Sequence, residues 1–153
     1  VLGQEHLAPC TPSGIISIME EEGIELAGRH VVIINHSVMI GKPLAMMLLK
    51  RNATVSVCHH ATKNIETFTK KADIIITATG VPRLIKGDMI KKGSVIIDAG
   101  ISVIDGNVAG DVDFKSVSEK TSAITPVPGG VGPVTVAALM RNTINAAKRI
   151  VEN

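Results

Sequence analysis

The segment from Asn35 to Gly41 has the residue types and spacing of a phosphate-binding loop. It follows an aliphatic run at 30–34 and precedes a helical pattern at 42–51. At such a turn the first amides of the helix point at an anion, and small residues let the backbone approach it. The frame is Asn35-x-Ser37-x-x-x-Gly41, which lacks two glycines of the usual glycine-x-glycine-x-x-glycine pattern. The pattern alone leaves two interpretations open, a cofactor loop and an ordinary strand-to-helix connection.

The residues after the next expected strand, at 53–58, bear on the choice of cofactor. Folds that take NAD usually place Asp or Glu there to bond the ribose 2′-hydroxyl. Here the strand runs into His59 and His60, with no carboxylate to repel a 2′-phosphate. This favours NADP, with NAD still possible; the other interpretation is a merely polar strand end. His59 is given no role of its own because it has no partner at a recognisable spacing.

Other groups that could do chemistry are sparse. Cys10 and Cys58 lie far apart without metal-ligand spacing, which is typical of free thiols in a reducing compartment such as the cytoplasm. Asp111 and Asp113 follow a turn sequence and fit a solvated loop better than a metal site. We therefore expect no metal site and assign no catalytic residue in this chain.

Short aliphatic runs that alternate with amphipathic stretches indicate the fold class. Near-continuous apolar runs are typical of parallel strands covered on both faces, and helices between them imply a doubly wound α/β sheet with flanking helices. The expected strands are at 30–34, 53–58, 73–77, 94–98 and 122–125, and the expected helices are at 15–22, 42–51, 65–71, 114–119 and 133–151. The last helix carries its apolar residues along one side and has Pro133 at its first position.

Composition excludes several classes of protein. The chain has 153 residues, the length of one domain, and 45% of them are hydrophobic. It has no Trp, no Tyr, two Phe and a net charge of +2, which argues against a nucleic-acid partner. No apolar run reaches the roughly 18 residues of a membrane span, so no membrane partner is expected.

Several motifs together resemble the methylenetetrahydrofolate dehydrogenase/cyclohydrolase family. The two most specific are Pro-Cys-Thr-Pro-x-Gly at 9–14 and Ile-Thr-Pro-Val-Pro-Gly-Gly-Val-Gly-Pro-Val-Thr at 124–135. Shorter matches in the same order lie at 53–55, 58–59, 78–82, 97–101 and 110–112. The resemblance covers the chain from about Pro9 to its end.

The resemblance implies a Rossmann-like NAD(P)-binding domain of an enzyme with two activities. Such enzymes oxidise 5,10-methylenetetrahydrofolate with NADP and hydrolyse the methenyl product to 10-formyltetrahydrofolate. Their catalytic lysine belongs to an N-terminal domain, so residues 1–12 are expected to connect from that missing domain and 13–153 to form the cofactor domain. The chain alone is then inactive; the whole enzyme is expected to bind tetrahydrofolate derivatives and to form a homodimer.

The site residues implied by this resemblance fall into two groups. Those expected to contact the cofactor are Asn35, His36, Ser37, Gly41, His60, Gly80, Pro82, Gly100 and Ile101; those expected to wall the folate cleft are Pro128, Gly129 and Gly130. The chain departs from the family at 35–37, where glycine-arginine-serine is usual. The loss of that arginine removes a permanent positive charge from the 2′-phosphate site.

Two alternative functions remain open at this stage. One is a different NADP dehydrogenase of similar layout, for example one acting on shikimate or amino acids, although the Pro-Val-Pro-Gly-Gly sequence at 126–130 speaks against it. The other is a nucleotide-binding or regulatory module without chemistry of its own. The absence of a candidate acid–base pair is what that alternative predicts.

Overall fold

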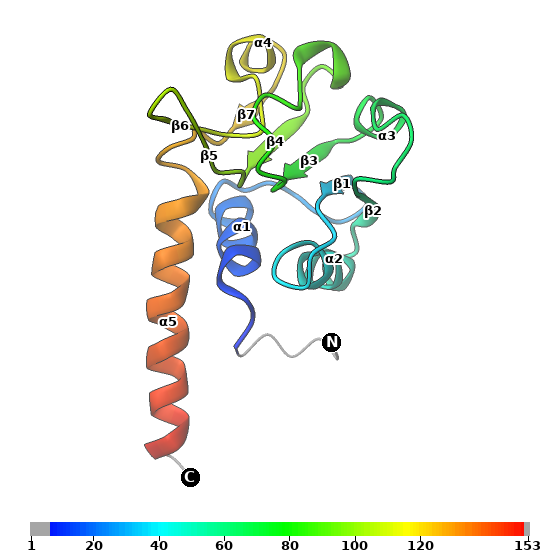
Figure 1. Ribbon diagram of the computed structural model, residues 1–153. Helices are drawn as coiled ribbons and strands as arrows, with labels where there is room; N and C mark the ends of the chain where they lie inside the picture. The colour runs from blue at the N-terminus through cyan, green and yellow to red at the C-terminus, as the bar shows by residue number, and fades with distance from the viewer. Residues whose placement is uncertain (1–6, 152–153) are drawn as a thin grey trace.

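Five parallel strands form the central sheet of the protein in the computed structural model, which describes residues 7–151 (Figure 1). They are β1 (His30–Ile34), β2 (Thr54–Cys58), β3 (Ile74–Thr77), β4 (Val95–Asp98) and β7 (Ala123–Ile124). Each lies within one residue of the range expected for it. The predicted doubly wound parallel sheet with flanking helices is therefore confirmed.

The order of the strands defines where loops can diverge to form a site. The order is β2-β1-β3-β4-β7, so the chain passes from β1 outward to β2 and then returns to pair β3 with the other side of β1. The direction of winding reverses between β1 and β3. In open α/β sheets, ligands bind at the carboxyl ends of the strands at such a reversal.

Successive residues of each strand point into two separate hydrophobic cores. Val31 and Ile33 of β1 pack toward α1 (Cys10–Glu21) and α2 (Gly41–Lys50). Val32 and Ile34 face the opposite core, to which α4 (Phe114–Ser118) contributes. Both faces of the sheet are thus covered, as Figure 1 shows, which explains why the strands read as continuous aliphatic runs.

Two helices begin earlier than predicted. α1 begins at Cys10 rather than Ile15, and α5 (Val131–Val151) begins two residues before Pro133. Pro12 and Pro133 each stand third in their helices. The first four N–H groups of a helix have no partner inside it, so a proline costs no hydrogen bond there. The prediction that Pro133 occupies the first helical position was therefore wrong by two residues, and Pro12, which the sequence analysis left outside the first helix, lies within it.

A short antiparallel hairpin was not predicted. β5 (Ser102–Ile104) pairs with β6 (Asn107–Ala109) across Asp105 and Gly106, which both have positive φ, at 49° and 79°. Positive φ at both central residues is the conformation of a two-residue hairpin turn. The remaining elements are α3 (Glu66–Thr69) and a 3-10 turn, η1 (Gly87–Met89).

The long helix α5 packs only part of its surface within the chain. It lies beside α1 and extends well beyond it (Figure 1). Gly14 of α1 faces the backbone at Val134 and Thr135, which lets the two helices approach closely. The expected apolar side is largely exposed, however, with Leu139 56% and Ile150 79% accessible. Among the described residues, no helix is both long and apolar enough to span a membrane.

Candidate functional site

The Asn35 side chain organises the loop between β1 and α2. Its Nδ2 donates to the carbonyl oxygen of Ala78, beyond β3, at 2.6 Å. Its Oδ1 accepts the backbone N–H of Ser37 at 2.8 Å and that of Gly41 at 3.0 Å. The carboxamide therefore ties together the two loops that diverge at the strand reversal. Asn35 was predicted as a cofactor contact. In the structure its side chain also holds the two loops together.

The absence of a side chain at Gly41 is required by the same loop. A Cβ at this position would overlap the carbonyl oxygen of Asn35. The Ser37 hydroxyl accepts the N–H of Ile40 at 3.1 Å, while among residues 7–151 the N–H groups of His36, Val38 and Met39 have no hydrogen-bond partner. Unpaired amides at the start of a helix suit an anion, and the helix dipole adds to this preference.

Three histidines gather beside this loop. The ring centroids of His36 and His59 are 5.0 Å apart, those of His36 and His60 5.5 Å, and those of His59 and His60 5.8 Å. The parallel register pairs Ile34 with Cys58, so the residues just after β1 and β2 meet at the same edge. His59 received no role in the sequence analysis, because only the pairing of the two strands brings it next to His36.

Gly80 and Ile101 meet at the next position along this edge. A Cβ on Gly80, whose φ is +71°, would lie 3.7 Å from the carbonyl oxygen of Ile101. The Ile101 side chain is 69% exposed despite its size. Pro82 is exposed as well, with no contact that ties it to these residues.

Two buried aspartates hold the loop that carries Gly100 and Ile101. Asp98 accepts the backbone N–H groups of Gly100 at 2.9 Å, Asp111 at 3.1 Å and Val112 at 2.9 Å. Burial raises the pKa of the Asp98 carboxyl above its ordinary value, and these three N–H groups oppose the increase. One oxygen of Asp111 accepts the Thr77 hydroxyl at 2.7 Å, while its other oxygen lies against Gly100 without a partner. Asp98 thus has a structural role in this loop.

A pocket of about 630 Å³ opens beside this supported loop. Its apolar wall is formed by Ile101, Val108 and the Pro-rich segment 126–133. Glycine is required at position 130, because a Cβ there would overlap the carbonyl oxygen of Pro126. Five predicted site residues line it together: Gly100, Ile101, Pro128, Gly129 and Gly130. Thr11 and Ile40 also line it and were missed, although both lie within or next to quoted motifs.

The predicted residues therefore divide between two adjoining areas. Asn35, Ser37 and Gly41 build the loop after β1, and His36 and His60 flank it. The pocket begins where Ile40, at the end of that loop, contributes to its wall. Within residues 7–151, no group of three or more His, Cys, Asp or Glu side chains is arranged to hold a metal ion. The geometry suits an extended ligand with an anionic part at the loop and a flat apolar part in the pocket.

Comparison with known proteins identifies the relatives of this chain. Residues 9–151 match the family described as tetrahydrofolate dehydrogenase/cyclohydrolase, NAD(P)-binding domain. The bifunctional protein FolD of Methanococcoides burtonii is 56% identical over 149 residues, which are 97% of this chain and 52% of that protein. FolD of Aquifex aeolicus is 55% identical over 95% of this chain and 50% of its own length. The chain thus spans about half the length of these relatives.

Solved structures share the same fold. The bifunctional dehydrogenase/cyclohydrolase FolD of Campylobacter jejuni has a TM-score of 0.91 and 48% identity, over 93% of this chain and 51% of that one. The FolD structure of Trypanosoma brucei, a complex with NADP cofactor and inhibitor, has a TM-score of 0.91 and 38% identity, over 97% of this chain and 53% of that one.

Proposed function

The chain belongs to the tetrahydrofolate dehydrogenase/cyclohydrolase family as its NAD(P)-binding domain, and we propose that it is the cofactor-binding half of a bifunctional folate enzyme. That enzyme oxidises 5,10-methylenetetrahydrofolate with NADP and hydrolyses the methenyl product to 10-formyltetrahydrofolate. The observation that carries the proposal is the pocket formed by Ile101 and the segment 126–133, which adjoins the loop 35–41 in a chain of this family. When bound, the nicotinamide supplies the hydride acceptor for the oxidation.

The residues at the carboxyl edge fit the cofactor. The pyrophosphate is held at the start of α2, where His36, Val38 and Met39 offer N–H groups with no other partner in the described chain. Gly41 lets the start of α2 lie against the Asn35 carbonyl, because a Cβ there would overlap that oxygen. Gly80, Gly100 and Ile101 receive the nicotinamide half, with Pro82 at the margin.

The preference for NADP over NAD rests on the three imidazoles. β2 ends at Cys58, and His59 and His60 follow where NAD-binding folds usually carry a carboxylate. His36 faces both rings from the loop after β1. Protonated imidazoles attract the 2′-phosphate. No carboxylate stands at positions 59 and 60, directly after β2, to repel it.

The folate ring occupies the pocket against Pro128, Gly129 and Gly130. Prolines keep this segment stiff and glycines keep it bare, so a flat ring can approach backbone groups. The only ionisable side chain in the pocket lining is Asp98, whose carboxyl is already bonded to three N–H groups. The proton-transfer groups must therefore come from a second half of the enzyme, which agrees with relatives about twice as long.

A titration and an activity assay test this proposal together. We expect a chain of residues 1–153 to bind NADP and to show no turnover of 5,10-methylenetetrahydrofolate. Turnover should appear when the N-terminal half of the enzyme is present. Activity in chain 1–153 above a heat-denatured blank contradicts the proposal that the proton-transfer groups come from the other half of the enzyme. NADP binding without turnover even in the presence of that half supports the alternative, a regulatory nucleotide-binding module.

We further infer a homodimer and a cytoplasmic location. The support for a dimer is the resemblance to the family and the apolar surface outside α5, which includes exposed Val57, Phe68, Val103 and Val108. Sedimentation that shows only monomer at roughly tens of micromolar contradicts it. The support for the cytoplasm is the pair of free cysteines, since Cys58 is buried and Cys10 half-buried without a disulfide.

A further inference from the structure

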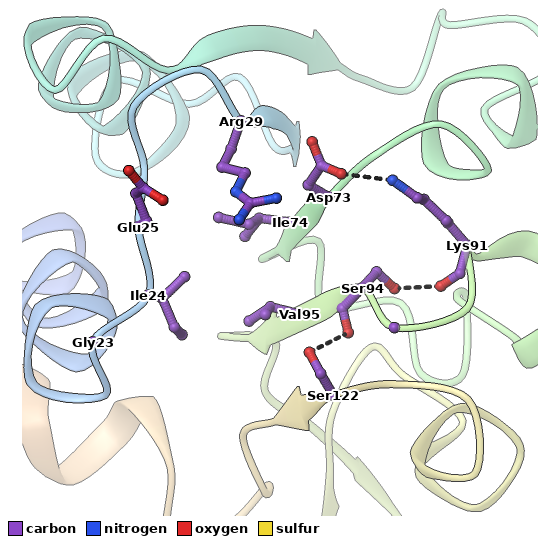
Figure 2. A pocket seen from close by; sticks show the side chains of 11 residues that line it. Gly23, Ile24, Glu25, Arg29, Asp73, Ile74, Lys91, Ser94, Val95 and Ser122 are labelled. Atoms are coloured by element: carbon purple, nitrogen blue, oxygen red, sulfur yellow. Dashed lines mark hydrogen bonds and ion pairs between the residues drawn. The ribbon is translucent and has the colours of Figure 1, made fainter.

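A second hollow lies at the amino end of the sheet, opposite the cofactor edge. Figure 2 shows it between the loop from α1 to β1, the loop before β4 and the start of β7. Its volume is about 440 Å³, within the usual range for small-ligand pockets. The half-buried side chains of Ile24 and Val95 give it apolar walls. The proposed cofactor and folate sites use none of these residues.

The Arg29 guanidinium extends into this hollow, where its charge helps to lower the pKa of the Asp73 carboxyl. Figure 2 shows it between the Glu25 loop and Asp73. Among residues 7–151, no hydrogen bond or ion pair within 4.0 Å joins this guanidinium to another group. A guanidinium carries five N–H donors in a fork that matches a carboxylate or phosphate. Arg29 is exposed, and a guanidinium without hydrogen bonds to the described residues at the wall of a hollow suits an oxyanion.

The neighbouring carboxylate of Asp73 already accepts a hydrogen bond on each oxygen, and the charge of Arg29 acts on it without a hydrogen bond between the two. Asp73 Oδ1 accepts Lys91 Nζ at 2.7 Å, and Asp73 Oδ2 accepts the backbone N–H of His30 at 3.0 Å. Lys91 keeps two further N–H donors on the wall opposite Arg29. The hydroxyls of Ser94 and Ser122 donate to backbone carbonyls, at 2.8 and 3.4 Å, so the two cations supply the free donors.

We propose that this hollow binds a small oxyanion, a carboxylate or a phosphate group, with Arg29 as its principal ligand and Lys91 as the second. Glu25 and Asp73 bring two negative charges to the same lining, so the ligand carries a single anionic group rather than a polyphosphate. The apolar body of the ligand lies against Ile24 and Val95. The site is independent of the NADP site at the other edge.

Titrations with inorganic phosphate and with acetate, each against chloride at constant ionic strength, test the site. Nuclear magnetic resonance follows the Arg29 Nε–H and the amides of 23–29 and 91–95. We expect saturable shifts there with one or both anions, and the anion that saturates identifies the ligand group. Signals at 35–41 report the cofactor loop separately, so failure of the proposed NADP site is distinguishable from failure of this one.

Two pairs of variants decide the outcome. Arg29→Gln should weaken binding about tenfold or more, because it removes the charge-assisted hydrogen bonds, while Lys92→Gln, an exposed lysine outside the lining, should not. Glu25→Gln should tighten binding about twofold to threefold because it removes a repelling charge, and exposed Glu22→Gln should have no such effect. Shifts that do not saturate, that equal those with chloride, or that persist in Arg29→Gln overturn the proposal.

Discussion

At the scale of single residues, three imidazoles gather at one edge of the sheet. The rings of His36, His59 and His60 lie 5.0–5.8 Å apart at the edge where β1 and β2 end. A histidine side chain changes its charge between about pH 5 and 8, whereas an arginine remains charged. A phosphate site built from imidazoles should therefore depend on pH within the physiological range.

We expect the ratio of NADP affinity to NAD affinity to fall as the pH rises from about 6.5 to 8.5. Protonated imidazoles attract the 2′-phosphate. Their loss of charge weakens the binding of NADP but not that of NAD, because NAD lacks the 2′-phosphate. A phosphate monoester gains negative charge near about pH 6, which flattens only the acidic end of the curve. Calorimetric titration with each cofactor at several pH values measures the ratio.

Matched variants separate the imidazoles from other causes of pH dependence. His36→Arg should tighten NADP and remove most of the slope, because a permanent charge replaces a titrating one. His36→Ala combined with His60→Ala should also flatten the slope but at weaker NADP affinity. A ratio that stays constant with pH in the parent protein would mean that these rings do not contact the phosphate.

Gly41 provides a second test at this scale. Gly41→Ala puts a Cβ onto the carbonyl oxygen of Asn35, so we expect about 1–3 kcal/mol of destabilisation, typical of overpacking. NADP affinity should fall as well, because the loop must shift. Gly132→Ala is the matched control, since a Cβ there meets nothing within 4 Å. Urea unfolding of both variants measures the difference; equal stability of the two contradicts the close-approach argument.

At the scale of elements, the sequence predicted the positions of the strands of the central sheet, because both faces of that sheet are buried. The strands lie within one residue of their expected ranges because an aliphatic run such as 30–34 is explained only by two covering layers. Pro128, Gly129 and Gly130 were predicted to wall a cleft, and all three line the pocket. The roles of individual loop residues as ligand contacts stay predictions.

Contacts between segments distant in sequence could not be predicted in this way. Asn35 bonds the carbonyl oxygen of Ala78, and His59 joins His36, only because β1 lies between β2 and β3. The β5–β6 hairpin was missed because its strands have three residues each, too few for an alternating pattern to stand out. Strand order, rather than local propensity, determines the contacts of Asn35 and His59.

The contact between Asp73 and Lys91 links the start of β3 to the loop before β4 and is open to a pH test. The hydrogen bond from Lys91 lowers the pKa of the Asp73 carboxyl, and the His30 N–H lowers it further. Because the folded-state pKa is depressed, the stabilisation is present above the pKa of the unfolded chain. It is lost as the pH falls through the folded value.

Lys91→Gln should therefore raise the pKa of Asp73 toward its ordinary value. The acid limb of the stability curve should shift to higher pH in this variant. Carbon-13 resonance titration of the Asp73 carboxyl measures the pKa directly. Lys92→Gln retains the hydrogen bond from Lys91 to Asp73 and should leave the titration of Asp73 unchanged. If Asp73 titrated identically in the parent protein and in Lys91→Gln, the contact would have no influence in solution.

At the scale of the whole molecule, α5 has more apolar surface than this chain covers. Of its residues only Val131 and Ala138 are buried, whereas Leu139, Met140 and Ile144 are more than half exposed. The chain spans about half the length of its relatives. We infer that the exposed side of α5 packs against the other half of the proposed enzyme.

Two adjacent residues of α5, one buried and one exposed, test this inference. Leu139→Gln should change the unfolding free energy of chain 1–153 by no more than about 0.5 kcal/mol, because its side chain is exposed there. It should weaken association with the N-terminal half about tenfold or more, since a buried leucine contributes about 1.5–3 kcal/mol. Ala138→Gln should do the reverse and destabilise chain 1–153 by about 1–3 kcal/mol, because it forces a longer side chain into a buried position. Urea unfolding and a binding titration measure both quantities. If Leu139→Gln bound the N-terminal half as tightly as the parent, this side of α5 would not be the surface that joins the two halves.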